Sequence, residues 1–371
     1  MYIKKGARNM FQQGLKGIVA AETSISHVDG EKGQLIYRGY DIQEVMESST
    51  FEQTAYLLWH GHFPTEKELN ELIASLKENR NLPSYMIDLI VSLPKDMDIM
   101  NVLRTVISAE GTPLYQWKPT IEQAIRLTAI APTIIAYRKR FIDGNPLVHP
   151  DASLNHVENY LYMLNGVVPI PAHTNALEAY MILAMEHGMN ASTFAARVTV
   201  STESDIVSAI TSAIGTMKGP LHGGAPAGVI SLLNEIYAAK DVEDTLRKKI
   251  NAGEKLMGFG HRIYKIHDPR SVALKSKLMQ FAGDDEWLDL SIRVEDIGVK
   301  VLNELKPGRA LYTNVEFYAA GIMKALNMDQ ELFTPTFSAS RFVGWTAHVL
   351  EQSENNVIFR PQSNYIGAVR V

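Results

Sequence analysis

Helical periodicity extends through almost the whole chain after residue 40, and this feature most limits the folds that the chain can adopt. Thr65 and Glu68 form a capping-box pattern, and the apolar residues that follow recur at the spacing of one helix face. Further helical patterns cover residues 121–140, 176–185, 204–217, 229–239, 274–281, 288–305 and 338–352. Because strands do not alternate with these helices, a parallel sheet is not expected. The pattern predicts an all-α fold.

A single clear β signal lies near the N-terminus. Two runs rich in β-branched and aromatic residues, 23–28 and 34–38, flank the polar, glycine-containing segment 29–33, and this arrangement predicts a small β hairpin. At 371 residues the chain is long enough for two or three domains. The turn at 219–226 and the loop at 327–334 are candidate hinges on either side of an inserted helical domain.

The composition excludes several classes of protein. The net charge of −5 gives no electrostatic basis for a nucleic-acid partner, and the basic run Arg138–Arg140 is expected to be a solvated helix end. The chain has no cysteine, so disulfides, thiolate nucleophiles and cysteine-ligated metals are excluded. The basic segment Met1–Lys5 is not followed by an apolar stretch, and no apolar run reaches the roughly 18 residues of a membrane helix. These observations predict a cytoplasmic protein that does not span a membrane.

Two histidines lie in glycine-rich turns. His222 stands in Gly219–Pro226, just before a helical pattern whose N-terminus would favour a neutral imidazole. The alternative is a turn histidine with no chemical role. His261 follows Met257, Gly258, Phe259 and Gly260 and precedes Arg262 and Arg270. Glycines and cations at this spacing are typical of an anion site, and no Walker lysine follows them.

The third candidate is Glu316, at the start of an apolar helical pattern. It can act as a general base, but Thr313 and Glu316 also match a capping box, in which the glutamate only closes the helix end. Arg341 is predicted in the first turn of a helix, where a cation opposes the helix dipole and needs another reason to be present. Local sequence also allows Arg360 to be an exposed tail residue without a function, and His187 to be a capping or core residue. A metal site formed by His222, His261 and Glu316 is a weaker alternative, because these residues lack local ligand spacing.

At these residues the chain resembles the citrate synthase family, and the likeness covers nearly its whole length. The motifs that carry it, in order, are Gly14-Leu15-Lys16-Gly17, Thr23-Ser24-Ile25-Ser26, Tyr37-Arg38-Gly39-Tyr40, Glu186-His187-Gly188-Met189-Asn190-Ala191-Ser192-Thr193, Gly219-Pro220-Leu221-His222-Gly223-Gly224, Gly258-Phe259-Gly260-His261-Arg262, Asp268-Pro269-Arg270, Ser340-Arg341 and Phe359-Arg360-Pro361. The chain length is similar to that of the shorter, dimeric bacterial and archaeal form.

The resemblance implies a helical homodimer with a large domain, residues 1–223 plus 328–371, and a small inserted domain, residues 224–327, that closes over the substrates. It also implies condensation of acetyl-CoA with oxaloacetate and water to give citrate and CoA. The coenzyme A thioester is then a substrate, and neither a cofactor nor a metal is implied. Closure excludes water from the reacting thioester.

The resemblance also assigns roles to individual residues. His222 would stabilise the enolate of the thioester, Glu316 would remove the methyl proton, and His261 would polarise the oxaloacetate carbonyl. The implied oxaloacetate-binding residues are His187, Arg270, Arg341 and, from the other subunit, Arg360. The implied CoA-binding residues are Met257, Gly258, Phe259, Gly260 and Arg262.

One residue departs from the family pattern. Glu316 stands where the family usually has aspartate, and the longer side chain moves the carboxylate by roughly 1 Å, so turnover is expected to be slow. Two other functions stay open. One is a 2-methylcitrate synthase, which uses propionyl-CoA and differs by one methyl group. The other is a non-catalytic family member that binds oxaloacetate without releasing CoA.

Overall fold

The computed structural model describes residues 11–223, 227–260, 264, 266–279, 283, 285–309 and 311–368. In these ranges the chain is mainly helical, which confirms the predicted all-α class. No helix among the described residues is long and apolar enough to cross a membrane.

The N-terminal part begins with a short 3-10 helix, η1 (Gln13–Leu15), and the predicted hairpin. The hairpin strands β1 (Ser26–Asp29) and β2 (Gln34–Tyr37) pair antiparallel, with Ser26 opposite Tyr37. A short third strand, β3 (Tyr40–Asp41), pairs with β2, so the hairpin is part of a three-stranded sheet. Gly39, at φ +93°, allows the tight turn between β2 and β3.

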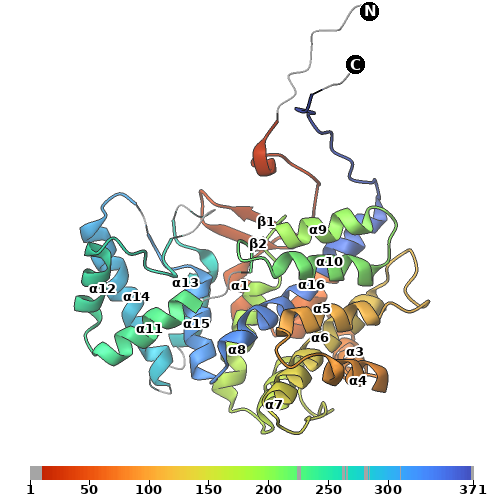
Figure 1. Cartoon of the computed structure of the whole chain (residues 1–371), viewed down its shortest axis with the longest axis horizontal. Helices are drawn as coiled ribbons and strands as arrows, with labels where there is room; N and C mark the ends of the chain where they lie inside the picture. The colour runs from red at the N-terminus through yellow and green to blue at the C-terminus, as the bar shows by residue number, and fades with distance from the viewer. Residues whose placement is uncertain are drawn as a thin grey trace, which may run out of the picture.

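Most helices form a larger group (Figure 1), and the apolar core cluster runs through this group and into the remaining helices. The helices of the larger group are α1 (Ile42–Ser48), α2 (Phe51–His60), α3 (Glu66–Asn79), α4 (Ser84–Ser92), α5 (Ile99–Ala109), α6 (Ile121–Ile142), α7 (His156–Asn165), α8 (Pro171–Ala184), α9 (Ala191–Val200), α10 (Ile206–Met217) and, after the 3-10 helix η2 (Gln330–Leu332), α16 (Phe333–Glu354). Helix α16 runs through the centre of this group and packs against α6, α8, α9 and α10. The capping box predicted at Thr65 and Glu68 is present at the start of α3.

A second group of helices lies to one side, on the left of Figure 1. It contains α11 (Ala227–Ala239), α12 (Val242–Asn251), α13 (Pro269–Met279), α14 (Glu286–Leu305) and α15 (Val315–Ala325). Helices α11, α12 and α14 pack on one another, and α11, α13 and α14 pack on α15. Helix α13 also packs on α1 and α8, and α15 also contacts α8. The arrangement brings the starts of α13 and α15 to the junction between the groups. That residues 224–327 form a domain that closes over the substrates stays a prediction.

Glu178, on α8, gives the fold a pH-dependent stability. Its carboxylate accepts a hydrogen bond from the N–H of Phe51 at 3.0 Å, and burial raises its pKa to about 7 from an ordinary 4.5. Ionising this group therefore destabilises the folded state progressively as the pH rises between these two values. We expect Glu178→Gln, which keeps an acceptor oxygen, to raise the free energy of unfolding by roughly 1–3 kcal/mol at pH 8 and little at pH 5. Chemical denaturation at both pH values measures this, and an equal effect at both would contradict it.

Candidate active site

His222 lies in a tight turn after α10. The N–H groups of His222 and Gly223 both donate to the carbonyl of Gly219, at 2.9 and 3.0 Å. A Cβ at Gly223 would come within 2.1 Å of the carbonyl oxygen of Met217, so only glycine fits there. The half-buried His222 ring therefore has a fixed position against the N-terminus of α9.

Helix α9 determines the tautomer of His222. Asn190 caps α9 by accepting the N–H of Thr193 at 3.1 Å, and the N–H of Ser192 points at Nε2 of His222 at 3.3 Å. Ser192 also places its hydroxyl 2.7 Å from the same ring nitrogen and accepts the indole N–H of Trp345 at 3.0 Å. Because a backbone N–H can only donate, Nε2 accepts and the ring proton lies on Nδ1.

The surroundings also keep His222 neutral. Burial, and then the charge of Arg341, lower the pKa of His222 to about 4. A neutral imidazole with its proton on Nδ1 can donate one hydrogen bond to a ligand without being a strong acid. The sequence predicted a neutral His222 because of the N-terminus of the helix that follows it. The helix N-terminus that contacts His222 is instead that of α9. Residues 224–226 are outside the described ranges.

The turn Met257–Gly260 lies directly beside the start of α15. The N–H of Gly260 donates to the carbonyl of Tyr312 at 2.7 Å, and the N–H of Asn314 donates to the carbonyl of Gly258 at 2.9 Å. Gly258 has φ +85°, and a Cβ there would come within 3.0 Å of the ring of Phe317. This short antiparallel pairing joins the glycine turn that precedes His261 to the segment that carries Glu316. His261 and Arg262 lie outside the described residues, so their predicted roles stay predictions.

Glu316 is the second residue of α15, and its predicted capping role is wrong. The N-cap is Asn314, whose side chain accepts the N–H of Glu316 at 3.1 Å. Thr313 instead donates from its hydroxyl to Glu295 and lies 3.0 Å from the hydroxyl of Ser271. Because Asn314 already caps the helix, the carboxylate of Glu316 is not needed for that purpose.

The environment of Glu316 favours a basic carboxylate. Solvent reaches its side chain, but many protein atoms surround it, and this partial desolvation raises the pKa of Glu316. The nearby charge of Arg270 opposes the shift, and that of Asp268 adds to it. A carboxylate with a raised pKa is a better proton acceptor than an ordinary surface glutamate.

Asp268 connects Arg270 to the start of α15. Its carboxylate accepts hydrogen bonds from Nε and Nη2 of Arg270, at 3.1 and 2.9 Å, and from the N–H of Val315 at 3.2 Å. Arg270 is 5% exposed. The helix α13 that carries it begins five residues before the predicted 274, because Asp268 accepts the N–H of Arg270 and Pro269 occupies the first helical position. Asp268 was not among the predicted site residues, although Asp-Pro before a helix is a recognisable start signal.

Arg341 lies deep in the core, on α16. This helix begins at Phe333, so Arg341 is in its third turn, and the predicted first-turn position is wrong. Its Nε donates to the carbonyl of Ala184 at 2.5 Å, and its guanidinium lies 4.8 Å from the centre of the Phe337 ring. Burial lowers the pKa of Arg341, and the charge of Arg270 lowers it further against the opposing effect of Glu186. Two buried guanidinium groups that act on each other electrostatically favour an anionic ligand with two charges.

His187 and Arg360 occupy different surroundings. His187 follows the end of α8, and its Nε2 lies 3.0 Å from the hydroxyl of Tyr264. Arg360 is exposed beyond α16, where it lines a groove between the two terminal segments. The neighbouring Phe359 packs on Phe194 at a ring distance of 5.6 Å. The single chain thus groups His187, His222 and the two buried arginines near the junction of the helix groups, and leaves Arg360 in the terminal groove.

The alternative metal site at His222, His261 and Glu316 stays untested, because His261 lies outside the described residues. Among the described residues, the one acidic cluster with metal-ligand spacing is Asp143, Asp329 and Glu331. The ammonium of Lys139 already lies 2.8, 2.5 and 2.9 Å from these three carboxylates. The cluster is therefore an ion-pair network that joins α6 to the segment before α16.

Known proteins resemble the chain over nearly its whole length. The family described as citrate synthase, C-terminal domain, matches residues 14–362. The chain is 42% identical over 364 residues to citrate synthase 2 of Bacillus subtilis, covering 96% of this chain and 95% of the relative. It is 36% identical over 367 residues to 2-methylcitrate synthase of Shewanella oneidensis, covering 97% and 96%.

A solved structure shares the fold. Citrate synthase of Thermoplasma acidophilum, in a ternary complex with carboxymethyl coenzyme A and oxaloacetate, superposes with a TM-score of 0.84 at 29% identity, over 97% of each chain. The family match and the relatives both extend over nearly the full length. The chain belongs to the citrate synthase family.

Proposed function

We propose that this protein is a citrate synthase, which condenses acetyl-CoA with oxaloacetate and water to give citrate and CoA. The observation that carries the proposal is that both groups lie near the buried arginines: Arg341 acts on a neutral His222, protonated on Nδ1, and Arg270 acts on the Glu316 carboxylate of raised pKa. A hydrogen-bond donor, a base and a dianion site are the groups that this condensation requires.

Oxaloacetate is proposed to bind first, against the buried arginines. Arg270 and Arg341 would hold its two carboxylates through charge-assisted hydrogen bonds. Each would donate from its terminal Nη nitrogens, because Nε of Arg270 donates to Asp268 and Nε of Arg341 donates to the carbonyl of Ala184. His187 would contact the carbonyl region. The desolvation of both arginines strengthens their attraction for the dianion, since water screens the charges less at a buried site.

Acetyl-CoA is proposed to react between Glu316 and His222. The carboxylate of Glu316 takes a proton from the thioester methyl group, while Nδ1–H of His222 donates to the thioester oxygen that gains negative charge. The enolate carbon then forms a bond to the oxaloacetate carbonyl carbon, and His261 would protonate the new alkoxide. Hydrolysis of citryl-CoA releases citrate and CoA. The turn Met257–Gly260, with Arg262, would contact coenzyme A, which is a substrate, and no cofactor or metal is proposed.

A homodimer in the cytoplasm is part of the proposal. The described segments before β1 and after α16 extend from the same side of the molecule, beyond α9 and α16 (Figure 1). They expose large apolar side chains, including Val19 at 84%, Val357 at 74% and Ile366 at 92%. Surfaces of this kind favour coverage by a second copy. In such a dimer, Arg360 would reach the oxaloacetate site of the partner subunit.

The 2-methylcitrate reaction is the second candidate, favoured by the likeness to the Shewanella oneidensis enzyme. One methyl group in an apolar pocket changes the binding free energy by about 1–3 kcal/mol, so the two reactions differ in degree. Mass spectrometry of products formed from oxaloacetate with equal amounts of acetyl-CoA and propionyl-CoA tests the proposal. We expect citrate to predominate. Predominant 2-methylcitrate would select the second candidate, and neither product would reject both.

The length of the Glu316 side chain is expected to limit turnover. Its carboxylate is one methylene further from the backbone than the aspartate usual in the family, and a displacement of roughly 1 Å can cost about 100-fold in rate. We therefore expect Glu316→Asp to raise kcat by about tenfold or more, with the KM for oxaloacetate unchanged. Steady-state CoA release measures both quantities. An equal or lower kcat would show that the backbone of α15 already compensates for the longer side chain.

A further inference from the structure

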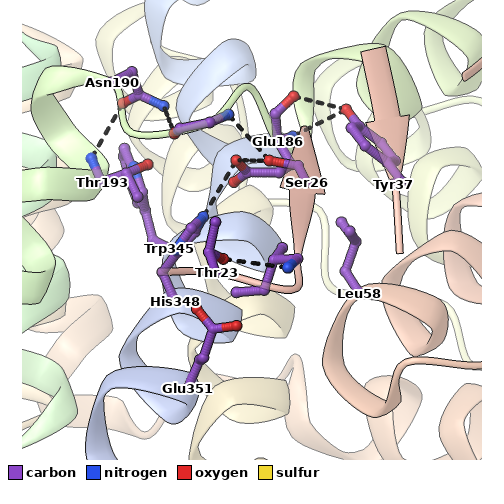
Figure 2. Close-up of polar contacts among 12 residues, drawn as sticks. Thr23, Ser26, Tyr37, Leu58, Glu186, Asn190, Thr193, Trp345, His348 and Glu351 are labelled. Atoms are coloured by element: carbon purple, nitrogen blue, oxygen red, sulfur yellow. Dashed lines mark hydrogen bonds and ion pairs between the residues drawn. The ribbon is translucent and has the colours of Figure 1, made fainter. Parts of the chain in front are cut away.

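The backbone on both sides of His187 is hydrogen-bonded to the N-terminal sheet (Figure 2). The hydroxyl of Tyr37 accepts the N–H of Glu186 at 3.1 Å and donates to the carbonyl of the same residue at 2.8 Å. The hydroxyl of Ser26 accepts the N–H of Gly188 at 3.2 Å and donates to Oε1 of Glu186 at 2.9 Å. The Tyr37 hydroxyl also lies 3.3 and 3.4 Å from the carbonyls of Ile182 and Leu183, at the end of α8. Together the two hydroxyls hold the residues before and after His187.

The sheet register explains why two hydroxyls meet at one turn. Ser26 on β1 and Tyr37 on β2 are directly paired across the antiparallel strands. Directly paired residues project from the same face of a sheet, so both side chains reach the turn after α8. Gly188, at φ +62°, supplies the left-handed conformation that this turn needs.

The contact is buried and polar. Tyr37 and Glu186 are both 0% exposed, and Oε1 of Glu186 lies 3.2 Å from Nε2 of the buried His348. Burial raises the pKa of Tyr37, so its hydroxyl keeps the proton that it donates. Burial also opposes ionisation of Glu186, but the charges of His348 and Arg341 outweigh it and lower the pKa of that carboxyl. Hydrogen bonds in such surroundings fix geometry strongly, because an unpaired buried group is costly.

We propose that Ser26 and Tyr37 are positioning residues for His187, through which the N-terminal sheet sets the affinity of the site for oxaloacetate. The inference rests on the proposed function, in which His187 contacts the oxaloacetate carbonyl. Neither residue touches substrate. Loss of either hydroxyl would free the turn on one side of His187 and shift its ring, and small displacements of a positioned group have large effects on binding and rate.

The test compares four variants of the full-length protein. Tyr37→Phe and Ser26→Ala each remove one hydroxyl, and Ser26→Thr restores it. Tyr137→Phe is the matched control. Tyr137 is a buried tyrosine on α6, and its hydroxyl lies 2.7 Å from Nδ1 of His149. We expect the KM for oxaloacetate and its calorimetric Kd to rise about tenfold in Tyr37→Phe and Ser26→Ala. The KM for acetyl-CoA should stay within about twofold, and Ser26→Thr and Tyr137→Phe should match the wild type.

The outcomes separate the inference from the function on which it rests. A lower thermal stability with an unchanged oxaloacetate KM and Kd would mean that the hydroxyls are only structural, and would overturn the inference. If Tyr37→Phe does not fold, the contrast between Ser26→Ala and Ser26→Thr decides. If the wild type binds oxaloacetate but releases no CoA, the proposed function fails, and the calorimetric Kd values still decide the positioning role. A wild type that binds no oxaloacetate overturns both.

Discussion

Replacing Glu316 with glutamine is expected to lower kcat by about a thousandfold, while oxaloacetate binding stays unchanged. Glutamine has nearly the same shape but cannot take a proton from the thioester methyl group. The stability of α15 should not change, because its N-cap is Asn314 and not Glu316. The loss should therefore appear in turnover and not in stability.

Glu66→Gln is the matched control for this experiment. Glu66 is an exposed glutamate in the first turn of α3, so the same substitution tests the effect of losing a charge at a helix start. CoA release, calorimetric oxaloacetate binding and thermal denaturation should be measured for both variants. Full activity in Glu316→Gln would remove the proposed base and contradict the mechanism.

Replacing His222 with alanine is expected to lower kcat by about 100- to 1,000-fold, the usual effect of removing one oxyanion donor. The donor is the Nδ1–H that Ser192 fixes by donating its N–H to Nε2 at 3.3 Å. Because the pKa of His222 is about 4, the imidazole stays neutral near pH 7. The loss of activity in the variant should therefore not change with pH near neutrality. Stopped-flow or steady-state measurement of CoA release gives the change in kcat.

His60→Ala controls for loss of a histidine. His60 is exposed, at the end of α2, and stacks on Tyr56 far along the chain from the site motifs. It should keep wild-type turnover. A kcat for His222→Ala within about threefold of the wild type would show that His222 is the structural turn residue that its local sequence also allows.

Local sequence patterns predicted the elements well where the determining contacts are local. The capping box at Thr65 and Glu68 is within four residues, and the hairpin 23–38 has its turn signal between its strands. The third strand, Tyr40–Asp41, was missed because two residues give no periodicity. The start of α16 was placed at residue 338, five residues after its first residue, Phe333. Pro335 lies in the first helical turn, where proline is tolerated.

The site depended on contacts between distant segments, which no local pattern reveals. The N-terminus that acts on His222 belongs to α9, thirty residues earlier in the chain. Asp268 reaches Val315 across 47 residues, and this contact places Arg270 near Glu316. The capping reading of Glu316 failed because Thr313 finds partners on other helices and Asn314 takes its place. The histidines and arginines were predicted from their motifs and from the family resemblance, and their roles stay predictions.

Oxaloacetate-dependent release of CoA from acetyl-CoA tests the central claim most directly. The chain has no cysteine, so a thiol reagent detects free CoA without background from the protein. Release that requires oxaloacetate, and that Glu316→Gln abolishes, is the result expected of a citrate synthase with Glu316 as its base. Binding of oxaloacetate by calorimetry with no release of CoA would contradict the account and identify a family member that binds its ligand without catalysis.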